Sequence, residues 1–267
     1  MTFVYILLAA QFFLLLYTFH KVRQTHLMTY GIKDQIENQT LELNNIYRQV
    51  QAYDALQRKL KFEEHLPPLR GWAASPDFLL TIAEHALNSK PDTIVECSSG
   101  ASTITLAQCA KLNNRGHVYS LENDAFYAEK TRTFLKKHHL DDWATVLHTP
   151  LIEIEGNRKW YDLSNIPEIQ EIDMLVIDGP PAFICQDTRY PALPNLIDKL
   201  KNATVFLDDA NRPEEKAIIK LWMNQYGVST VTSHECEKGC ISFTIGPISG
   251  LSKTSRSNLA TASVEAV

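Results

Sequence analysis

The chain has 267 residues, of which 45% are hydrophobic and 21% charged, and its net charge at pH 7 is −5. This composition is typical of a globular protein with one sizeable core, and the absence of a basic field argues against a nucleic-acid partner. The five cysteines are scattered and odd in number, which indicates a reducing compartment rather than a disulfide framework.

The first segment, residues 2–19, contains no charged side chain. A stretch of about 18 apolar residues is near the lower limit for crossing a bilayer. It lacks the basic start and the small-residue cleavage site of a secretory signal, so we expect a transmembrane anchor over residues 1–22. Lys21 and Arg23 follow the apolar run, and this positive charge predicts that the main body faces the cytoplasm.

A helical stalk is expected next, over residues 23–65. Residues 32–64 contain neither glycine nor proline, and apolar side chains recur at heptad spacing. The two rows are Ile36, Leu43, Val50 and Ile46, Tyr53, Leu60. About three imperfect heptads leave two interpretations open. One is a coiled coil that forms a homodimer through residues 32–64, and the other is a single helix packed on its own domain.

From residue 66 to 247 the pattern alternates between strands and helices. The expected strands are 93–96, 117–122, 144–149, 172–178, 203–209, about 228–233 and 240–246, and the expected helices are 77–87, 102–111, 125–138, 194–200 and 213–226. Such alternation predicts an α/β domain with a doubly wound, mostly parallel, seven-stranded sheet that ends in an antiparallel pair. The Ser/Thr/Ala-rich residues 248–267 are expected to form a disordered tail.

Acidic side chains stand at the ends of four expected strands. They are Glu96, Glu122, Asp178 and the pair Asp208–Asp209. In doubly wound sheets, ligands bind beyond the carboxyl ends of the strands. Any one of these acids is accounted for equally well as a turn or capping residue. Four strands that deliver acids to one edge indicate a shared site.

The turn after the first strand reads Ser98-Ser99-Gly100-Ala101-Ser102. It lacks the three glycines of a dinucleotide loop and the Gly-Lys-Ser/Thr of a P-loop, which disfavours both NAD enzymes and P-loop ATPases. Ser102 or Thr103 is placed to cap the helix that follows. Glu122, at the end of the second strand, is placed to accept hydrogen bonds from a ribose diol.

Over roughly residues 70–247, this layout resembles the class I S-adenosylmethionine-dependent methyltransferases. Glu96 and Gly100 match the acid and the middle glycine of the family's first motif, whereas Ser98 and Ser102 replace its outer glycines. The resemblance implies that S-adenosyl-L-methionine is the cofactor. The residues it implies for cofactor binding are Glu96, Ser98, Gly100, Ser102, Glu122, His148 and Asp178, with His148 and Thr149 bordering the adenine.

Two later motifs, "VIDGPP" and "FLDDANRP", resemble those of metal-dependent catechol-type and sugar O-methyltransferases. This implies a divalent ion such as Mg²⁺ on Asp178, Asp208 and Asp209, with Asp178 as a catalytic residue. In the alternative, Asp178 acts alone as base or substrate anchor and the Asp208–Asp209 pair caps the next helix.

Other residues are weaker candidates. Trp72 is either part of a lid over the cofactor or a packing anchor, and Arg189, Tyr190 and Arg212 are candidates for contacting a phosphate or sugar. The resulting expectation is a membrane-anchored methyltransferase that acts on oxygen in a hydroxylated small-molecule or glycan acceptor. The alternative is a non-catalytic, membrane-anchored scaffold with a degenerate methyltransferase fold, which the two serine replacements favour.

Overall fold

The computed structural model describes residues 2–69, 71–164, 166–228 and 230–246. The tail expected at 248–267 lies outside this range. The chain divides into two compact units, Met1–Arg48 and Gln49–Val267. We describe each unit by itself.

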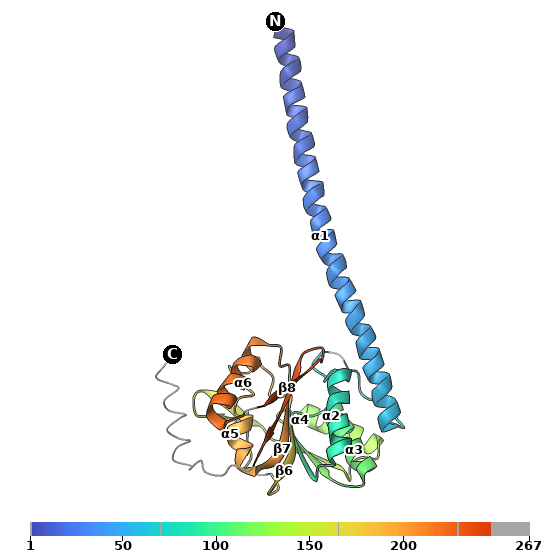
Figure 1. Ribbon diagram of the computed structural model, residues 1–267, viewed down its shortest axis with the longest axis vertical. Coiled ribbons are helices and arrows are strands. Elements are labelled where there is room, and N and C mark those ends of the chain that lie inside the picture. The colour runs from blue at the N-terminus through green and yellow to red at the C-terminus, as the bar shows by residue number, and fades with distance from the viewer. Residues whose placement is uncertain (1, 70, 165, 229, 247–267) are drawn as a thin grey trace. The chain divides into compact units, whose positions relative to one another are not determined.

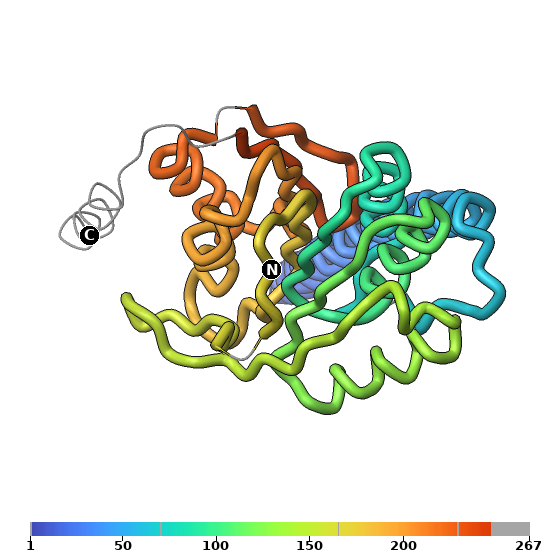
Figure 2. The backbone as a smooth tube through the Cα atoms, turned by 90° about the horizontal axis from the view of Figure 1, so that it is seen from below, coloured from blue at the N-terminus to red at the C-terminus, as the bar shows by residue number. Residues whose placement is uncertain are grey.

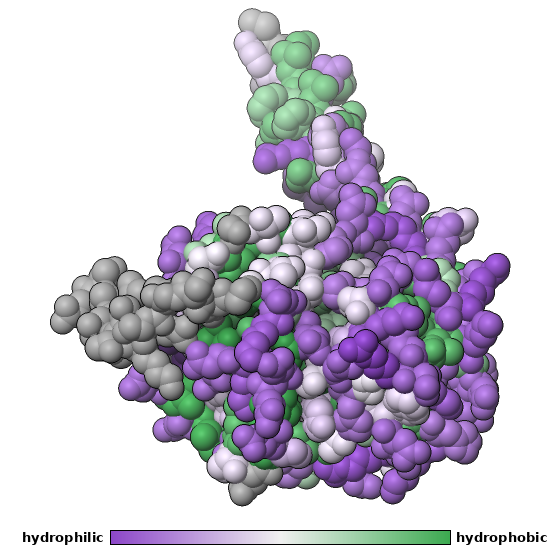
Figure 3. Space-filling model, turned by 60° about the horizontal axis from the view of Figure 1, so that its bottom comes forward, coloured by the Kyte–Doolittle hydropathy of each residue, from purple (hydrophilic) through white to green (hydrophobic). Residues whose placement is uncertain are grey.

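The first unit consists of most of helix α1 (Thr2–Leu60) (Figure 1). Its N-terminal part is apolar and the part that follows is mainly hydrophilic (Figure 3). By length and composition α1 is capable of crossing a membrane, a test that signal sequences and core helices of soluble proteins also pass. The helix is therefore a candidate span.

The last turns of α1 belong to the second unit. Ala52, Leu56 and Leu60 are buried there, and their spacing of four places them on one face of the helix. This part of the stalk packs on its own domain, so the domain begins before the expected boundary at residue 66. Ile36 and Leu43 are exposed, and pairing with a second copy of the chain through them stays a prediction.

The second unit contains the expected seven-stranded sheet, in the order β3-β2-β1-β6-β7-β9-β8. Its strands are β1 (Thr93–Cys97), β2 (His117–Glu122), β3 (Ala144–His148), β6 (Ile172–Ile177), β7 (Leu200–Asp208), β8 (Val231–His234) and β9 (Cys240–Ile245). The pairs from β3 to β7 are parallel, and β9 is antiparallel to both β7 and β8. The predicted sheet and its antiparallel ending are confirmed.

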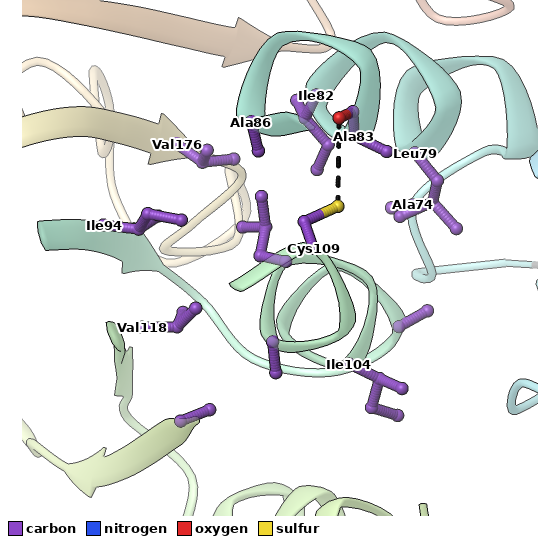
Figure 4. Packing of buried hydrophobic residues seen from close by; sticks show 14 of the residues in the cluster. Ala74, Leu79, Ile82, Ala83, Ala86, Ile94, Ile104, Cys109, Val118 and Val176 are labelled. Atoms are coloured by element: carbon purple, nitrogen blue, oxygen red, sulfur yellow. Dashed lines mark hydrogen bonds between the residues drawn. The ribbon is translucent and has the colours of Figure 1, made fainter. Parts of the chain in front are cut away.

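Helices cover both faces of this sheet (Figure 2). They are α2 (Pro76–Ser89), α3 (Ala101–Asn113), α4 (Ala125–Lys137), α5 (Ala192–Leu196), which continues into a 3₁₀ turn (Ile197–Lys199), and α6 (Pro213–Tyr226). Side chains alternate along each strand, so Ile94 packs with α2, α3 and α4 while Val95 packs with α5 and α6. Figure 4 shows the first of these two cores, where Ile94 and Val118 of the sheet lie near Cys109 of α3.

A two-stranded hairpin between β3 and β6 was not expected from the sequence. Strands β4 (Leu151–Ile154) and β5 (Arg158–Tyr161) pair antiparallel around a turn in which Gly156 and Asn157 have positive φ. The strands are four residues long and much of β4 is exposed, so their apolar alternation is too short to stand out. Trp160 and Tyr161 are buried and attach the hairpin to the second core.

Candidate active site

The acid-bearing strand ends meet at one edge of the sheet. Glu96 lies opposite Ser120 of β2, Cys97 opposite Ile177 of β6, and Ile177 opposite Leu207 of β7. After β1 the chain builds outward through β2 and β3, then returns to the other side of β1 with β6. The topology therefore switches between β1 and β6, where ligands of doubly wound sheets bind.

The buried side chain of Glu96 links the start of α3 to β2 by hydrogen bonds. Its side chain is fully buried and accepts hydrogen bonds from Thr103 Oγ1 at 2.6 Å and Ser120 Oγ at 2.7 Å. Burial raises the pKa of Glu96 to about 7, although hydroxyl donors, Ser102 among them, oppose this. Glu96 and Ser102 were both expected to contact a cofactor. Their side chains are 0% and 3% exposed in the described structure, and their part in cofactor binding stays a prediction.

The backbone of the same turn borders open space. Gly100 has φ of 146°, and a Cβ placed on it would meet no atom within 4 Å. Ser98 has φ of 120°, a conformation that side-chain-bearing residues rarely adopt. Gly100, rather than a serine side chain, precedes the first residue of α3 as its N-cap. A serine thus holds a glycine-like conformation two residues before Gly100, where the space around the Cα is open.

Glu122 ends β2 close to this turn. One carboxylate oxygen accepts a hydrogen bond from Ser99 Oγ at 2.7 Å and the other from the Asp124 N–H at 3.0 Å. The side chain is 7% exposed, and burial raises its pKa. The sequence did not single out Ser99, because a contact between the two strand ends exists only after the strands pair.

A cavity of about 310 Å³ lies beyond the end of β3. Its lining includes His148, Thr149 and Asp162. The Thr149 N–H donates to the carbonyl oxygen of Glu122 at 2.7 Å, so the cavity adjoins the end of β2. His148 and Thr149 therefore stand beside Glu122 and line this cavity, and their contact with an adenine ring stays a prediction.

Asp178 follows β6 and is held against the turn after β1. Its N–H donates to the Cys97 carbonyl at 3.1 Å. A Cβ on the next residue, Gly179, would lie 2.7 Å from the Tyr161 hydroxyl oxygen and 3.0 Å from Ser98 Cβ. Only glycine allows so close an approach, and no sequence pattern had indicated that Tyr161 lies next to it.

The three aspartates expected to act together are close to one another. Asp178, Asp208 and Asp209 can each place a carboxylate oxygen within 4.8 Å of the others. Burial raises the pKa of Asp178 to about 6 and that of Asp208 well above its usual range. Both side-chain oxygens of Asp208 lack a hydrogen-bond partner among the described residues.

A buried arginine already lies among these acids. Arg189 is 3% exposed, and its Nη2 lies 2.6 Å from Asp209 Oδ2 and 3.3 Å from Asp178 Oδ1. Arg212 also contacts Asp209 Oδ2, at 2.9 Å. The sequence suggested that both arginines contact a phosphate or sugar. Arg189 instead forms ion pairs inside the protein, whereas the Arg212 side chain is 42% exposed and its contact with such a group stays a prediction.

The donor types of this cluster suit a divalent ion, whereas its arrangement does not. Mg²⁺ favours carboxylate oxygens and keeps several waters in its octahedral shell. Here two of the three acids are bound by a guanidinium, and Asp208 and Asp209 are enclosed. The predicted gathering of the acids is confirmed, but the residues as arranged do not form an open three-carboxylate metal site.

Two exposed aromatic rings stand near Asp178. Trp72 and Phe183 are each 74% exposed and make an edge-to-face contact with centroids 5.5 Å apart. Lys238 donates to the Ala73 carbonyl at 3.1 Å, and its charge also lowers the pKa of Asp178. Trp72 is therefore no anchor in a core, and its segment lies on the same side of the domain as Asp178.

Comparisons with known proteins agree with this architecture. A family model described as "Methyltransferase domain" matches residues 95–210. No curated protein matches the chain. Three solved structures that share the fold are an O-methyltransferase from Bacillus cereus in complex with SAH, the SAH-bound methyltransferase PaMTH1 from Podospora anserina and a methyltransferase from Geobacter sulfurreducens.

The sequence identities to these three structures are 14%, 15% and 14%, with TM-scores of 0.50, 0.50 and 0.51. The matches cover 73%, 72% and 75% of this chain and 91%, 94% and 89% of theirs, in the same order. At such identities the likeness concerns the fold. The chain thus has the Rossmann-like fold of class I methyltransferases and resembles the O-methyltransferases among them.

Proposed function

We propose that this domain binds S-adenosyl-L-methionine at the carboxyl edge of its sheet and transfers the methyl group to an oxygen of its acceptor. The observation that carries the proposal is the position of Glu122, between the open turn at Gly100 and the cavity beside His148. A carboxylate there suits a ribose diol, with the methionine part toward the turn and the adenine toward the cavity.

In this proposal the residues divide into two groups. Ser98, Gly100, Glu122 and His148 line the cofactor. Glu96 and Ser102 hold the turn in shape from beneath, because their side chains are enclosed. Two of the solved structures with the same fold are described as SAH-bound, which supports a cofactor of this type.

Asp178 is the proposed base. The acceptor O–H gives its proton to the Asp178 carboxylate, and the oxygen takes the methyl group from the sulfonium, which leaves with the bonding electron pair as a neutral thioether. A base works best with a pKa near the working pH. Burial raises the pKa of Asp178 to about 6, so the carboxylate is mostly ionised at pH 7 and still accepts a proton readily.

For the acceptor we propose a hydroxylated ring, sugar-like or aromatic. Trp72 and Phe183 offer two ring surfaces to solvent, and Phe183 follows Asp178 by five residues. Aromatic side chains bind ring compounds through their faces and edges while the hydroxyl groups remain free to react. The pair would hold such a ring with one hydroxyl toward the base.

We also propose that α1 anchors the protein in a membrane, with the methyltransferase domain in the cytoplasm. The support is the uncharged run at residues 2–19, followed by Lys21 and Arg23. An acceptor at or near the bilayer would suit such an anchor. A homodimer through the exposed heptad positions Ile36 and Leu43 is a further part of this proposal.

The competing function is a scaffold that has lost its cofactor. The serine at position 98 was its best support, yet Ser98 keeps a glycine-like backbone and Gly100 keeps the space beside it open. A binding site that had decayed would have no need of this strained turn. These features favour an active enzyme.

The test is isothermal titration calorimetry of the full chain in detergent micelles with S-adenosyl-L-methionine and with SAH. We expect stoichiometric binding of both. If neither ligand binds at millimolar concentration while the protein is folded by circular dichroism, the proposed function is wrong and the scaffold is favoured.

A further inference from the structure

We infer that Arg189 is a built-in counter-ion that takes the place of a divalent metal, so that the acidic cluster works without one. As a positioning residue, it holds Asp178 for the proposed base role. The second part rests on the proposed function, whereas the exclusion of a metal ion does not.

The guanidinium joins the ends of two adjacent strands. Nη1 donates to the Asp208 carbonyl at 2.9 Å, and Nη2 donates to the Asp178 carbonyl at 3.0 Å. Nη2 also reaches the carboxylates of Asp209 and Asp178. A bound ion would link the same two strand ends through its ligands. Here a planar group with fixed donor directions makes that link.

The charges of the cluster also support Arg189 as the counter-ion. Arg189 Nη1 also lies 3.7 Å from Glu215 Oε1, so three carboxylates from three elements surround this one cation. Arg212 adds a second positive charge on Asp209. A divalent ion on these acids would sit beside a guanidinium that cannot lose its proton and cannot leave, because it is 3% exposed.

The backbone around Arg189 is fixed as well. The Tyr190 N–H donates to the Asp187 carbonyl at 3.0 Å, and the Trp222 indole N–H donates to the Tyr190 carbonyl at 3.1 Å. Trp222 is fully buried in α6. The backbone next to Arg189 is thus held by a large core side chain, which keeps the guanidinium at a fixed position.

One observation favours an ion over the arginine. The two side-chain oxygens of Asp208 have no hydrogen-bond partner among the described residues, and a bound ion would provide one. Its neighbours Asp178 and Asp209 and its burial all favour the neutral acid. The two hypotheses predict different affinities for divalent cations. If the acids form an ion site, the native protein binds such cations. If Arg189 is the permanent counter-ion, binding appears only when Arg189 is removed.

We would titrate Mn²⁺ into the full chain in micelles and follow the free ion by electron paramagnetic resonance. The native protein should show no specific site at submillimolar Mn²⁺. Arg189→Met should gain one site, with an affinity at least about tenfold above any residual Mn²⁺ binding of the native protein, because the cation within the acids is gone. Asp208→Asn should abolish this site in the Arg189→Met background. Arg158→Met is the control, since its guanidinium lies over the Tyr190 ring outside the cluster. Tight stoichiometric Mn²⁺ binding by the native protein would overturn the inference.

A second readout separates charge from packing. Arg189→Met should lower the midpoint of thermal unfolding, because the guanidinium that links the carboxylates of Asp178 and Asp209 is then gone. Arg189→Lys keeps the positive charge and should restore part of the loss. A loss that lysine does not reduce would show a packing role only and would overturn the counter-ion role. Cofactor titration of the same samples tests the proposed function separately.

Discussion

Ser99 Oγ donates a 2.7 Å hydrogen bond to Glu122 and so joins the turn after β1 to the end of β2. The Asp124 N–H already donates to the other carboxylate oxygen. In the proposed binding mode, the ribose hydroxyls therefore share Glu122 with this serine or displace it. The hydrogen bond holds the Glu122 carboxylate in place, and breaking it would reduce the free energy gained when a ligand binds Glu122.

Replacing Glu122 should weaken cofactor binding directly. Glu122→Ala removes both acceptors for the ribose hydroxyls, and hydrogen bonds to a charged group contribute about 1.5–3 kcal/mol. We expect the Kd for S-adenosyl-L-methionine to rise by about tenfold to a hundredfold in calorimetry. An unchanged Kd would remove Glu122 from the cofactor site.

Replacing Ser99 should have a different effect. Ser99→Ala frees one oxygen of Glu122, and a hydrogen bond to a charged group contributes about 1.5–3 kcal/mol. The Kd for the cofactor should stay the same or fall by about tenfold, while the free energy of unfolding decreases by a similar amount. A large loss of affinity would mean that Ser99 itself binds the cofactor.

Gly179→Ala should destabilise the domain, because the new methyl group would overlap with the Tyr161 hydroxyl and press on Ser98. Overpacking of this kind costs about 1–3 kcal/mol in the free energy of unfolding, measured by urea denaturation. The double variant Gly179→Ala with Tyr161→Phe removes the nearest overlapping atom and should recover part of the loss. Full stability of the single variant would contradict the observed packing.

The stability of the protein should depend on pH through Glu96. Its pKa in the folded protein is about 7, above the ordinary value of 4.5 that applies when unfolded. The folded state therefore holds the proton more tightly, and the stability from this group is complete below pH 4.5 and is lost as pH rises through 7.

Glu96→Gln keeps the shape without the titration. The stability of this variant relative to the native protein should therefore increase from pH 5 to pH 8, by about 3 kcal/mol at most. Chemical denaturation at the two pH values measures this difference. The same change at both pH values would show that Glu96 is ionised throughout.

Asp178→Asn should separate chemistry from binding. Loss of a general base typically lowers turnover by about 10² to 10⁴. We expect this loss in kcat, measured as SAH release with an acceptor, and a cofactor Kd within about threefold of native. Loss of cofactor binding with no change in kcat for the bound enzyme would assign Asp178 to the cofactor instead.

Much of the fold followed from local patterns. Helix α6 and strand β2 occupy their expected residues, because apolar periods of 3.6 and 2 reflect which side of an element is buried. The β4–β5 hairpin could not be predicted in this way, because its strands are short and β4 is largely exposed. The stalk was ambiguous for a similar reason, since Tyr53 and Leu60 belong to a heptad row that suits a partner helix and also pack in the core of their own domain.

The sequence by itself determined that Glu96, Glu122, Asp178 and Asp208 stand at the carboxyl ends of strands, because alternating strands and helices make the strands parallel. The order that makes these strands neighbours came from the tertiary structure. Only the tertiary structure decided what each acid does. Glu96 is sealed beneath its turn, Glu122 is paired with Ser99, and Asp178 shares Arg189 with Asp209. The physical reason is that burial and charge pairing depend on contacts between segments far apart in the chain, which no local pattern contains.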